Sequence, residues 1–432
     1  MKAKLLLLAC AAAALAACGP DPINPKRQIG AQPYLPQIHQ YLFPPMHVVK
    51  NAGWGDGAPK PAPGLQVKAL ARNLKNPRSL YVLPNGDILV VETEGPGEPA
   101  SRPKQFIFNW VEKKAHSSTK AGNRIVLLRD ADGNGITKMQ TVFLDHLHSP
   151  FGVVLVGNDL YVADTDAVMR YPYQEGQTQI TAPGTKLTDL PGGPIDHHWT
   201  KSLTAGPDGT KLYAGVGSNS NVGENGMEAE KERAAIWEID RASGAHRLYA
   251  TGLRNPNGLT FEPESHALWA VINERDELGP DLVPDYLTSV KDGAFYGWPY
   301  SYYGQHLDPR VMPQRPDLTA KAIPPDYALS SHVAPLGLVF YTGTTLPAIY
   351  RGGAFVGEHG SWNRQELNGY KVVFVPFSGG KPSGMPQDVL TGFIDGDQAH
   401  GRPVGLAIDK QGALLVADDV GGTVWRVTAA AR

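Results

Sequence analysis

Six segments of the sequence place a cationic or imidazole side chain shortly before a small residue and an apolar strand. Their leading side chains are Lys75, His148, His198, Arg254, His332 and Arg402, in residues 75–80, 148–153, 198–203, 254–259, 332–338 and 402–406. Histidine can transfer protons near neutral pH, and arginine keeps its charge and binds carboxylates or oxyanions. Repeated units arranged radially bring equivalent positions to one axis. The pattern therefore predicts a basic central pocket for an anionic ligand.

The third and fourth segments contain the strongest catalytic candidates. His197 and His198 open one segment, and Arg254 and Asn255 open the next. A base can take the proton of an alcohol while a permanent cation stabilises charge that builds up on a hydride acceptor. An isolated histidine is more often a hydrogen-bonded core or turn residue, so the repetition carries the functional interpretation. The pair is what oxidation of an alcohol requires.

Four further motifs carry polar groups. Gly279 and Pro280 follow a predicted strand; their free carbonyls suit calcium, although Gly-Pro is also an ordinary turn. Residues 130–135 resemble the start of a calcium loop, but Thr141 stands at its twelfth position, so we expect a hairpin turn. We expect a solvated loop with internal ion pairs at residues 274–277 and a pocket wall at residues 358–364. The sequence contains no phosphate-binding glycine loop, zinc-ligand spacing or nucleophile elbow.

Composition indicates an all-β protein with many turns. The 432 residues carry a net charge of -2, which gives no indication of a nucleic-acid partner. The 48 glycines and 37 prolines make up about a fifth of the chain, against a usual share of roughly 12%. Strand-turn-strand units recur at a spacing of roughly 50 to 80 residues. This spacing predicts a six-bladed β-propeller of four-stranded antiparallel blades, in which residues 423–427 form an outer strand sharing a blade with the N-terminal segment.

The N-terminus resembles a bacterial lipoprotein signal. Residues 1–18 combine a charged start, a short apolar run and the sequence Leu-Ala-Ala-Cys ending at Cys18, the expected site of acylation. The alternative is an ordinary secretory signal cleaved nearby. Cys10 and Cys18 are the only cysteines in the sequence, so no internal disulfide is expected after processing. We expect a location in the bacterial periplasm, with a lipid anchor to the outer membrane through Cys18.

The rest of the chain divides into two parts. Residues 19–64 are rich in Pro, Gly and Gln and predict a tether and an arm lying over the domain surface. Residues 65–432 predict the propeller domain.

The motifs resemble the quinoprotein aldose dehydrogenases that use pyrroloquinoline quinone (PQQ), particularly the L-sorbosone dehydrogenase branch. The resemblance covers roughly residues 65–428 and is carried by residues 251–259, 279–280, 296–299 and 357–364. It implies that His198 is the base for the anomeric hydroxyl, with Arg254 over the quinone carbonyl and Asn255 beside the cofactor. It also implies that the carbonyls of Gly279 and Pro280 hold a calcium ion that polarises the quinone.

The same resemblance assigns the remaining site residues. Further cofactor contacts are His332, His359, Arg364 and Arg402, of which Arg402 pairs with a cofactor carboxylate, and the substrate contacts are His197 and Tyr327. Some positions depart from the family pattern: His400 replaces an arginine, Ser330 a stacking tryptophan and His197 an acid, and Asp285-Tyr286 keeps half of an acidic pair. These departures suit the sorbosone branch better than the glucose branch.

The sequence thus predicts a PQQ- and calcium-dependent enzyme that oxidises C1 of an aldose or sugar aldehyde and passes electrons to a periplasmic acceptor. One alternative is a non-catalytic propeller that binds an anionic or sugar ligand in the same basic pocket. Another is a calcium-dependent lactonase propeller, which is disfavoured because that chemistry needs side-chain carboxylates on the axis.

Overall fold

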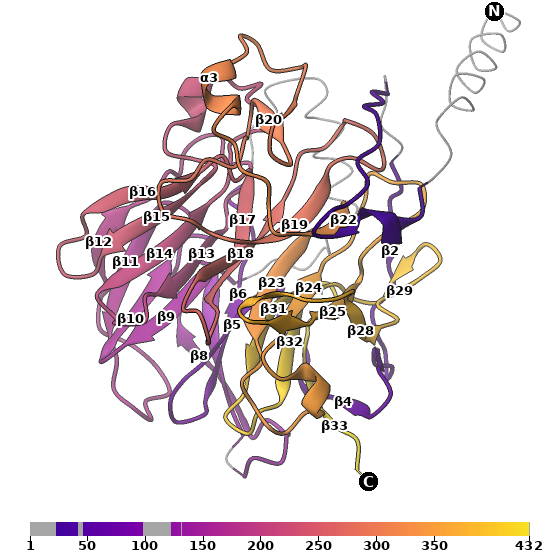
Figure 1. Ribbon diagram of the computed structural model, residues 1–432. Coiled ribbons are helices and arrows are strands. Elements are labelled where there is room, and N and C mark those ends of the chain that lie inside the picture. Colours follow the sequence, from indigo (N-terminus) through magenta and orange to yellow (C-terminus); the bar gives the residue numbers. More distant parts are fainter. Residues whose placement is uncertain (1–22, 42–45, 98–121, 131, 432) are drawn as a thin grey trace, which may run out of the picture.

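The chain folds almost entirely into antiparallel sheets (Figure 1). The computed structural model describes residues 23–41, 46–97, 122–130 and 132–431. The predicted all-β class is confirmed. Six sheets in the described residues have four or five strands, which in spatial order are β5 (Pro77–Val82), β6 (Ile88–Glu92), β7 (Arg124–Arg129) and β8 (Met139–Leu144); β9 (Gly152–Val156), β10 (Asp159–Ala163), β11 (Ala167–Pro172) and β12 (Thr185–Asp189); β13 (Lys201–Ala205), β14 (Lys211–Val216), β15 (Ala235–Asp240) and β16 (His246–Thr251); β17 (Asn255–Phe261), β18 (Leu268–Asn273), β19 (Pro284–Ser289), β22 (Tyr327–Ser331) and β1 (Ile29–Gly30); β23 (Pro335–Phe340), β24 (Ala354–Glu358), β25 (Lys371–Val375), β28 (Gln387–Thr391) and β3 (Lys60–Pro61); and β31 (Pro403–Ile408), β32 (Leu414–Asp418), β33 (Thr423–Ala429) and β4 (Leu65–Ala71).

The remaining elements are short. Small sheets are formed by β2 (Lys50–Asn51), β30 (Gln398–Ala399) and β29 (Ile394–Asp395); by β20 (Ser301–Tyr302) and β21 (His306–Leu307); and by β26 (Phe377–Ser378) and β27 (Lys381–Pro382). The helices are η1 (Pro25–Gln28), η2 (Met227–Glu230), α3 (Pro316–Thr319) and η3 (Ala348–Tyr350). Among the described residues, no helix has the length and apolar character needed to cross a membrane.

The first strands of the six sheets form a closed ring. They contact one another in the order β5, β9, β13, β17, β23 and β31, and β31 returns to β5. The small residue of the repeated segments explains the close approach. A Cβ on Gly405 would lie 2.7 Å from the Arg78 carbonyl oxygen, and one on Gly258 would lie 2.8 Å from Leu338 Cβ. Larger side chains at these positions would push neighbouring first strands apart.

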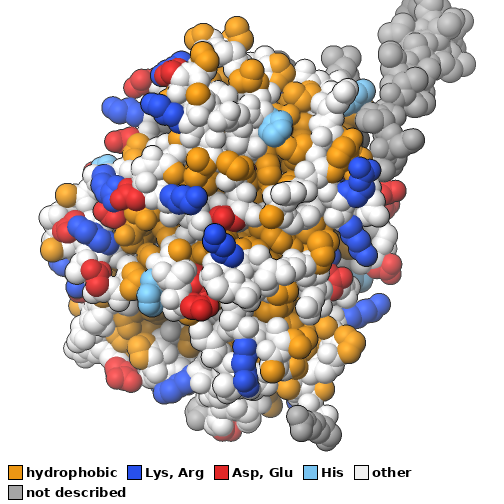
Figure 2. All heavy atoms as spheres, viewed as in Figure 1, with side chains coloured by type: hydrophobic (Ala, Val, Ile, Leu, Met, Phe, Trp, Pro, Cys, Tyr) orange, Lys and Arg blue, Asp and Glu red, His pale blue; other side chains and the backbone are white. Residues whose placement is uncertain are grey.

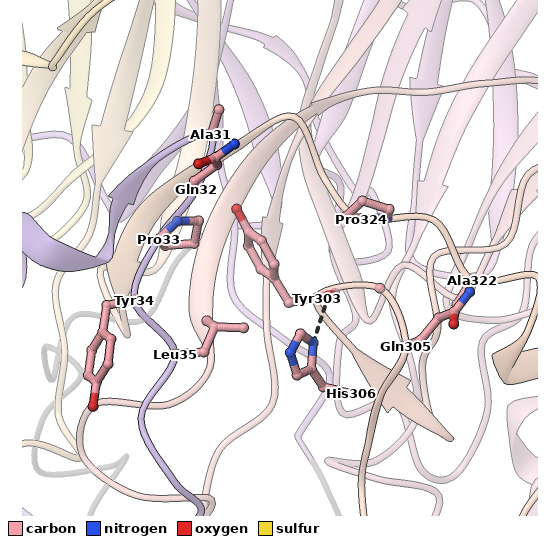
Figure 3. A pocket seen from close by; sticks show the side chains of 11 residues that line it. Ala31, Gln32, Pro33, Tyr34, Leu35, Tyr303, Gln305, His306, Ala322 and Pro324 are labelled. Atoms are coloured by element: carbon pink, nitrogen blue, oxygen red, sulfur yellow. Dashed lines mark hydrogen bonds between the residues drawn. The ribbon is translucent and has the colours of Figure 1, made fainter.

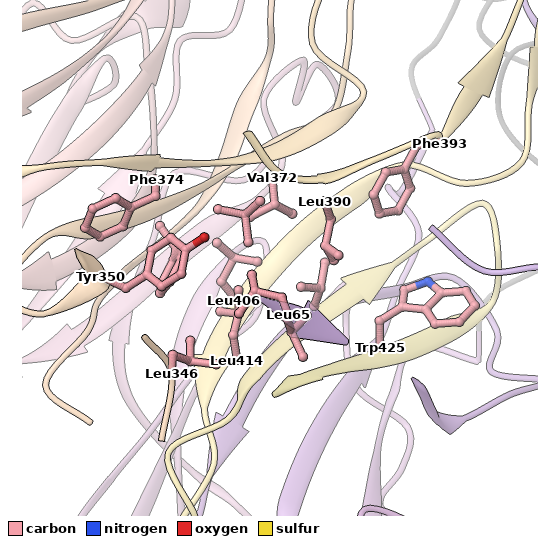
Figure 4. Close-up of a cluster of buried hydrophobic side chains, with 14 of the residues drawn as sticks. Leu65, Leu346, Tyr350, Val372, Phe374, Leu390, Phe393, Leu406, Leu414 and Trp425 are labelled. Atoms are coloured by element: carbon pink, nitrogen blue, oxygen red, sulfur yellow. The ribbon is translucent and has the colours of Figure 1, made fainter. Parts of the chain in front are cut away.

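The hydrophobic core lies between successive sheets. In the second strand of a sheet, such as β6, every residue is buried, because both faces of the sheet are covered by neighbours. Figure 4 shows one such cluster, in which Phe374 and Val372 from β25 meet Leu406, Leu414 and Trp425 from the last sheet. The alternating turns and apolar strands of the sequence therefore build a continuous set of intersheet cores.

The two ends of the described chain meet in the last sheet. Strand β33 pairs with β4 in antiparallel register, with Val427 opposite Val67. The predicted sharing of a sheet by residues 423–427 and the N-terminal segment is confirmed, but the position was wrong, because β4 and not β33 is the edge strand. Within residues 19–64, the short strands β1 and β3 extend two other sheets at their edges.

Two local predictions can be compared with the structure. Residues 130–135 lie in the connection of the β7–β8 hairpin, where Gly135 N donates to Asp130 Oδ2 at 2.6 Å, so the hairpin prediction is confirmed. Side chains of both charges are mixed over the face seen in Figure 2, in keeping with the net charge of -2. The predicted signal at residues 1–18, including Cys18, lies outside the described residues.

Candidate active site

His198 lies just before β13, and the segment after β14 fixes its ring. Its Nδ1 lies 2.8 Å from the Ser218 carbonyl oxygen and 3.0 Å from Ser218 Oγ. A carbonyl oxygen can only accept, so Nδ1 carries the proton and Nε2 has a free lone pair. Within the part of the chain that the structure describes, Nε2 has no hydrogen-bond partner.

Burial, followed by the charges of Arg254 and His197, lowers the pKa of His198 well below 6.5. The His197 ring meets the His198 ring edge-on, with centroids 4.6 Å apart. His198 is therefore a neutral imidazole at physiological pH. This is the state that a general base requires.

A buried ionic network supports the segment that carries His198. Lys201 Nζ donates to the carbonyl oxygens of His198 and Trp199 at 3.3 and 2.9 Å. Asp196 balances the buried positive charges, with Arg233 Nη2 at 2.6 Å and Lys201 Nζ at 3.4 Å. Burial lowers the pKa of Lys201 to about 8. These contacts hold the backbone from which the imidazole projects.

Arg254 lies immediately before β17 and is only 3% exposed. Its Nη1 donates to the Glu274 carbonyl oxygen at 2.6 Å, and its Nη2 lies 3.1 Å from Asp276 Oδ2. Its Nε donates to the Asn221 carbonyl oxygen at 3.3 Å, which also accepts from Trp298 Nε1 at 2.9 Å. The two motifs that carry the family resemblance thus meet at one carbonyl group.

Asp276 connects Arg254 to His332. Asn363 Nδ2 donates to Asp276 Oδ1 at 2.7 Å, and His332 Nδ1 lies 3.4 Å from the same oxygen. Burial raises the pKa of Asp276, but its hydrogen bond with His332 and the charges of Arg254, His332 and His197 outweigh burial and hold the pKa at about 2. Asp276 therefore stays ionised and joins the cationic groups into one network.

Sequence reasoning missed the roles of Asp276, Asn221 and Asn363. The prediction of a solvated loop at residues 274–277 was wrong, since Glu274 and Arg275 are 2% and 0% exposed. The expected internal ion pair is present, with Arg275 Nε 3.1 Å from Glu274 Oε2. Clustered charges are usually solvated, and only the folded structure shows that these are covered. The motif at residues 358–364 contained the signal for Asn363.

Gly279 and Pro280 do not fit the expected calcium site. The Gly279 carbonyl oxygen accepts from His332 Nε2 at 3.2 Å, and the Pro280 carbonyl oxygen accepts from Arg364 Nη1 at 2.7 Å. Arg364 Nη2 lies 2.9 Å from Asp281 Oδ1, so a guanidinium already occupies this position. No group of three or more His, Cys, Asp or Glu side chains in the described ranges could hold a metal ion. The pair of carbonyls is present, but it binds side-chain cations.

A second polar cluster contains His359 and Arg402. His359 Nε2 lies 2.9 Å from Asp419 Oδ2, and Arg78 Nη1 lies 2.9 Å from the same oxygen. Arg402 stacks over the Tyr370 ring at 4.8 Å and donates from Nη2 to its hydroxyl at 3.0 Å. Burial, together with the charges of Arg402 and Arg78, lowers the pKa of His359 despite Asp419. This cluster holds two cations around one carboxylate.

Some side chains of the repeated segments do not join these clusters. Lys75 is exposed, and His148 is more than half exposed, in an ion pair with Asp166 at 3.0 Å. The prediction that all six side chains converge is wrong for these two. Tyr327 packs inside the core between the sheets of β17 and β23, where its hydroxyl donates to the Gly384 carbonyl oxygen at 2.7 Å. The structure therefore does not place Tyr327 at the surface of a substrate pocket.

A separate pocket of about 570 Å³ lies between the arm and the loops around β20 and β21 (Figure 3). The side chains of Tyr34, Leu35, Tyr303 and His306 line it. None of the predicted site residues lines this pocket.

Comparison with known proteins identifies the family of the chain. A profile described as TrAA12-like matches residues 115–284 and 313–430. The chain belongs to the TrAA12-like family. The resemblance to PQQ-dependent sugar dehydrogenases that the motifs predicted is thereby confirmed.

Relatives of this TrAA12-like chain include proteins with stated activities and one without. An uncharacterized protein from Borreliella burgdorferi is 28% identical, covering 74% of this chain and 87% of the relative. A PQQ-dependent pyranose dehydrogenase from Coprinopsis cinerea is 24% identical over 85% of this chain, and the match spans only 55% of that longer protein.

Solved structures share the fold of this TrAA12-like protein. The PQQ domain of the Coprinopsis cinerea pyranose dehydrogenase has a TM-score of 0.69 at 20% identity, covering 88% of this chain and all of that one. The PQQ-bound aldose sugar dehydrogenase of Streptomyces coelicolor has a TM-score of 0.56 at 18% identity, covering 86% and 100%.

Proposed function

We propose that this protein is a PQQ-dependent dehydrogenase that oxidises C1 of an aldose or of a sugar aldehyde such as sorbosone. The observation that carries the proposal is the neutral His198 imidazole, whose Nε2 is free and which feels the positive charge of the buried Arg254. The family membership supports it, because characterised relatives are PQQ-dependent sugar dehydrogenases.

The polar groups near this base fit a cofactor that carries carboxylates and carbonyls. Arg402 Nε, Asn255 Oδ1 and Asn363 Oδ1 are buried atoms without a hydrogen-bond partner among the described residues. A buried polar atom left unpaired costs about 1–3 kcal/mol, so such atoms mark a place where a polar ligand adds stability. Arg402 suits a carboxylate, and the amide groups of Asn255 and Asn363 suit polar ring atoms. When bound, PQQ would supply the two-electron acceptor for the hydride that leaves C1.

The side chains of the chain would perform the proton chemistry. His198 Nε2 would accept the proton of the C1 hydroxyl, and the contact of Nδ1 with Ser218 would keep the ring in the accepting tautomer. Arg254 would stabilise negative charge developing near the base, since its own position is fixed by Glu274 and Asp276. His197, packed against the base, is our candidate for a substrate contact.

We also propose the finer organisation that the sequence predicted. The six sheets would be the six blades of a propeller, and the ring of first strands supports this arrangement. Residues 1–18 would be a lipoprotein signal with Cys18 as the lipidated residue, and residues 19–64 would be a tether and arm. The protein would then act in the bacterial periplasm, bound to the outer membrane, and deliver electrons to a periplasmic acceptor.

The test is sugar-dependent dye reduction by purified protein reconstituted with PQQ. We expect His198→Ala to lower turnover by ~10²–10⁴-fold, and Arg254→Ala by ~10²–10³-fold. The matched control is His148→Ala, which removes an exposed histidine from an equivalent repeat. Each variant is checked for PQQ binding and for its unfolding midpoint.

Two outcomes would contradict the proposal. Full turnover by folded His198→Ala would exclude His198 as the base. PQQ binding by the wild type without reduction of dye by any aldose or sugar aldehyde would favour the alternative of a non-catalytic binding propeller.

A further inference from the structure

We propose that the Arg364 guanidinium takes the position that the resemblance assigned to calcium, so that this protein binds its quinone cofactor without a metal ion. The inference rests on the proposed function, because it concerns the same cofactor. It arises from the disagreement between the calcium expected at Gly279 and Pro280 and the contacts that these residues make.

Three contacts fix the guanidinium against this segment. Arg364 Nη1 donates to the Pro280 carbonyl oxygen at 2.7 Å, Nη2 lies 2.9 Å from Asp281 Oδ1, and Nε donates to the Glu366 carbonyl oxygen at 3.1 Å. Both charged side chains are buried, at 3% exposure for Arg364 and 5% for Asp281. The positive charge is therefore held by a built site and cannot be displaced without leaving Asp281 buried and unpaired.

The N-terminal arm closes this site from outside. Gln28 is fully buried and donates from Nε2 to the Asp281 carbonyl oxygen, while its Oε1 accepts from Ser331 Oγ at 3.1 Å. The backbone N–H of His39 donates to the Leu278 carbonyl oxygen at 2.9 Å. The segment that would bind calcium is thus enclosed by protein groups that already use its oxygens.

The guanidinium can replace part of the chemistry of a divalent ion. It keeps its charge at any physiological pH, and it has five N–H donors. The three contacts use one N–H from each nitrogen, which leaves one N–H on Nη1 and one on Nη2 for a carbonyl or carboxylate oxygen of the cofactor. Calcium placed on the Pro280 carbonyl would lie next to this fixed positive charge, so the two cations exclude each other.

The wild-type protein provides the first test. Protein treated with EDTA is titrated with PQQ, following tryptophan fluorescence, in the presence of EDTA or of 1 mM calcium chloride, roughly physiological for an extracellular calcium site. We expect dissociation constants that agree within about threefold, a difference of less than ~1 kcal/mol. Calcium chloride without PQQ should leave the unfolding midpoint unchanged.

The second test removes the guanidinium. Arg364→Ala leaves the Asp281 carboxylate beside two free carbonyls, which is a set of oxygen ligands for calcium. We expect PQQ affinity in EDTA to fall ~10–100-fold, the loss typical of a hydrogen bond to a charged group. Calcium should now restore binding and raise the unfolding midpoint in the absence of PQQ. The matched control is Arg351→Ala, which removes an exposed arginine.

A double variant covers the case in which Arg364→Ala fails to fold. Arg364→Met combined with Asp281→Asn removes both charges, so no carboxylate remains buried without its partner. It should lose metal-free PQQ binding and gain no response to calcium.

The outcomes separate this inference from the proposed function. PQQ binding by the wild type that requires calcium, or metal-free binding unchanged in the folded variants, would overturn the role of Arg364 and leave the dehydrogenase proposal standing. Absence of PQQ binding both with and without calcium would overturn both.

Discussion

Glu358 should make the stability of this protein depend on pH. It is the last residue of β24, it is 3% exposed, and its Oε2 has no hydrogen-bond partner among the described residues. Burial raises the pKa of Glu358 from 4.5 to about 8; Lys371 lowers it, and Asp388 and Asp285 add to the rise. Because the pKa is raised by folding, the stabilisation is complete below pH 4.5 and is lost as the pH rises through 8.

The size of the effect follows from this pKa. A difference of about 3.5 between the folded and unfolded pKa corresponds to ~5 kcal/mol at most, at ~1.4 kcal/mol for each pH unit. Integrated from pH 5 to pH 8.5, the loss for this one carboxyl is about 4 kcal/mol. Glu358→Gln keeps the shape and removes the titration, so the wild type should lose about 4 kcal/mol more unfolding free energy than the variant over this range.

The assay is urea unfolding of the two proteins at pH 5 and pH 8.5. Other buried carboxyls with a raised pKa, such as Asp285 and Asp418, are present in both proteins and cancel in the difference. The exposed Glu264→Gln serves as the matched control and should retain the wild-type dependence. An identical pH dependence of the wild type and Glu358→Gln would refute the reasoning.

Two further predictions concern the catalytic base. The acidic limb of the pH profile of kcat/KM should lie below pH 6.5, since burial, Arg254 and His197 lower the pKa of His198, and Arg254→Met should move this limb to higher pH in the residual activity; a wild-type limb above pH 6.5 would contradict this. Gly217→Ala should lower turnover about 100-fold with little change in fold, because the added Cβ would press on His198 Cβ and lie 2.6 Å from Asn255 Oδ1; unchanged kinetics would show that neither side chain needs its present position.

Much of the architecture was available from the sequence. Apolar strands bounded by Gly- and Asn-containing turns predicted the all-β fold, since short-range turn chemistry is a local property. The repeated segments located His198, Arg254, His332 and Arg402, because the small residue in each is required where first strands approach one another. The family resemblance also came from short motifs that keep their local order.

The tertiary structure alone decided which charges are buried and what they contact. Residues 274–277 looked solvated because they are charged, yet Asp276 is a central member of the network that joins Arg254 and His332. Tyr327 went to the core, and the Pro280 carbonyl went to Arg364 and not to a metal ion. These outcomes depend on segments that are distant in the chain but adjacent in space. Burial and ionic pairing are properties of that packing, and no local pattern of residues contains them.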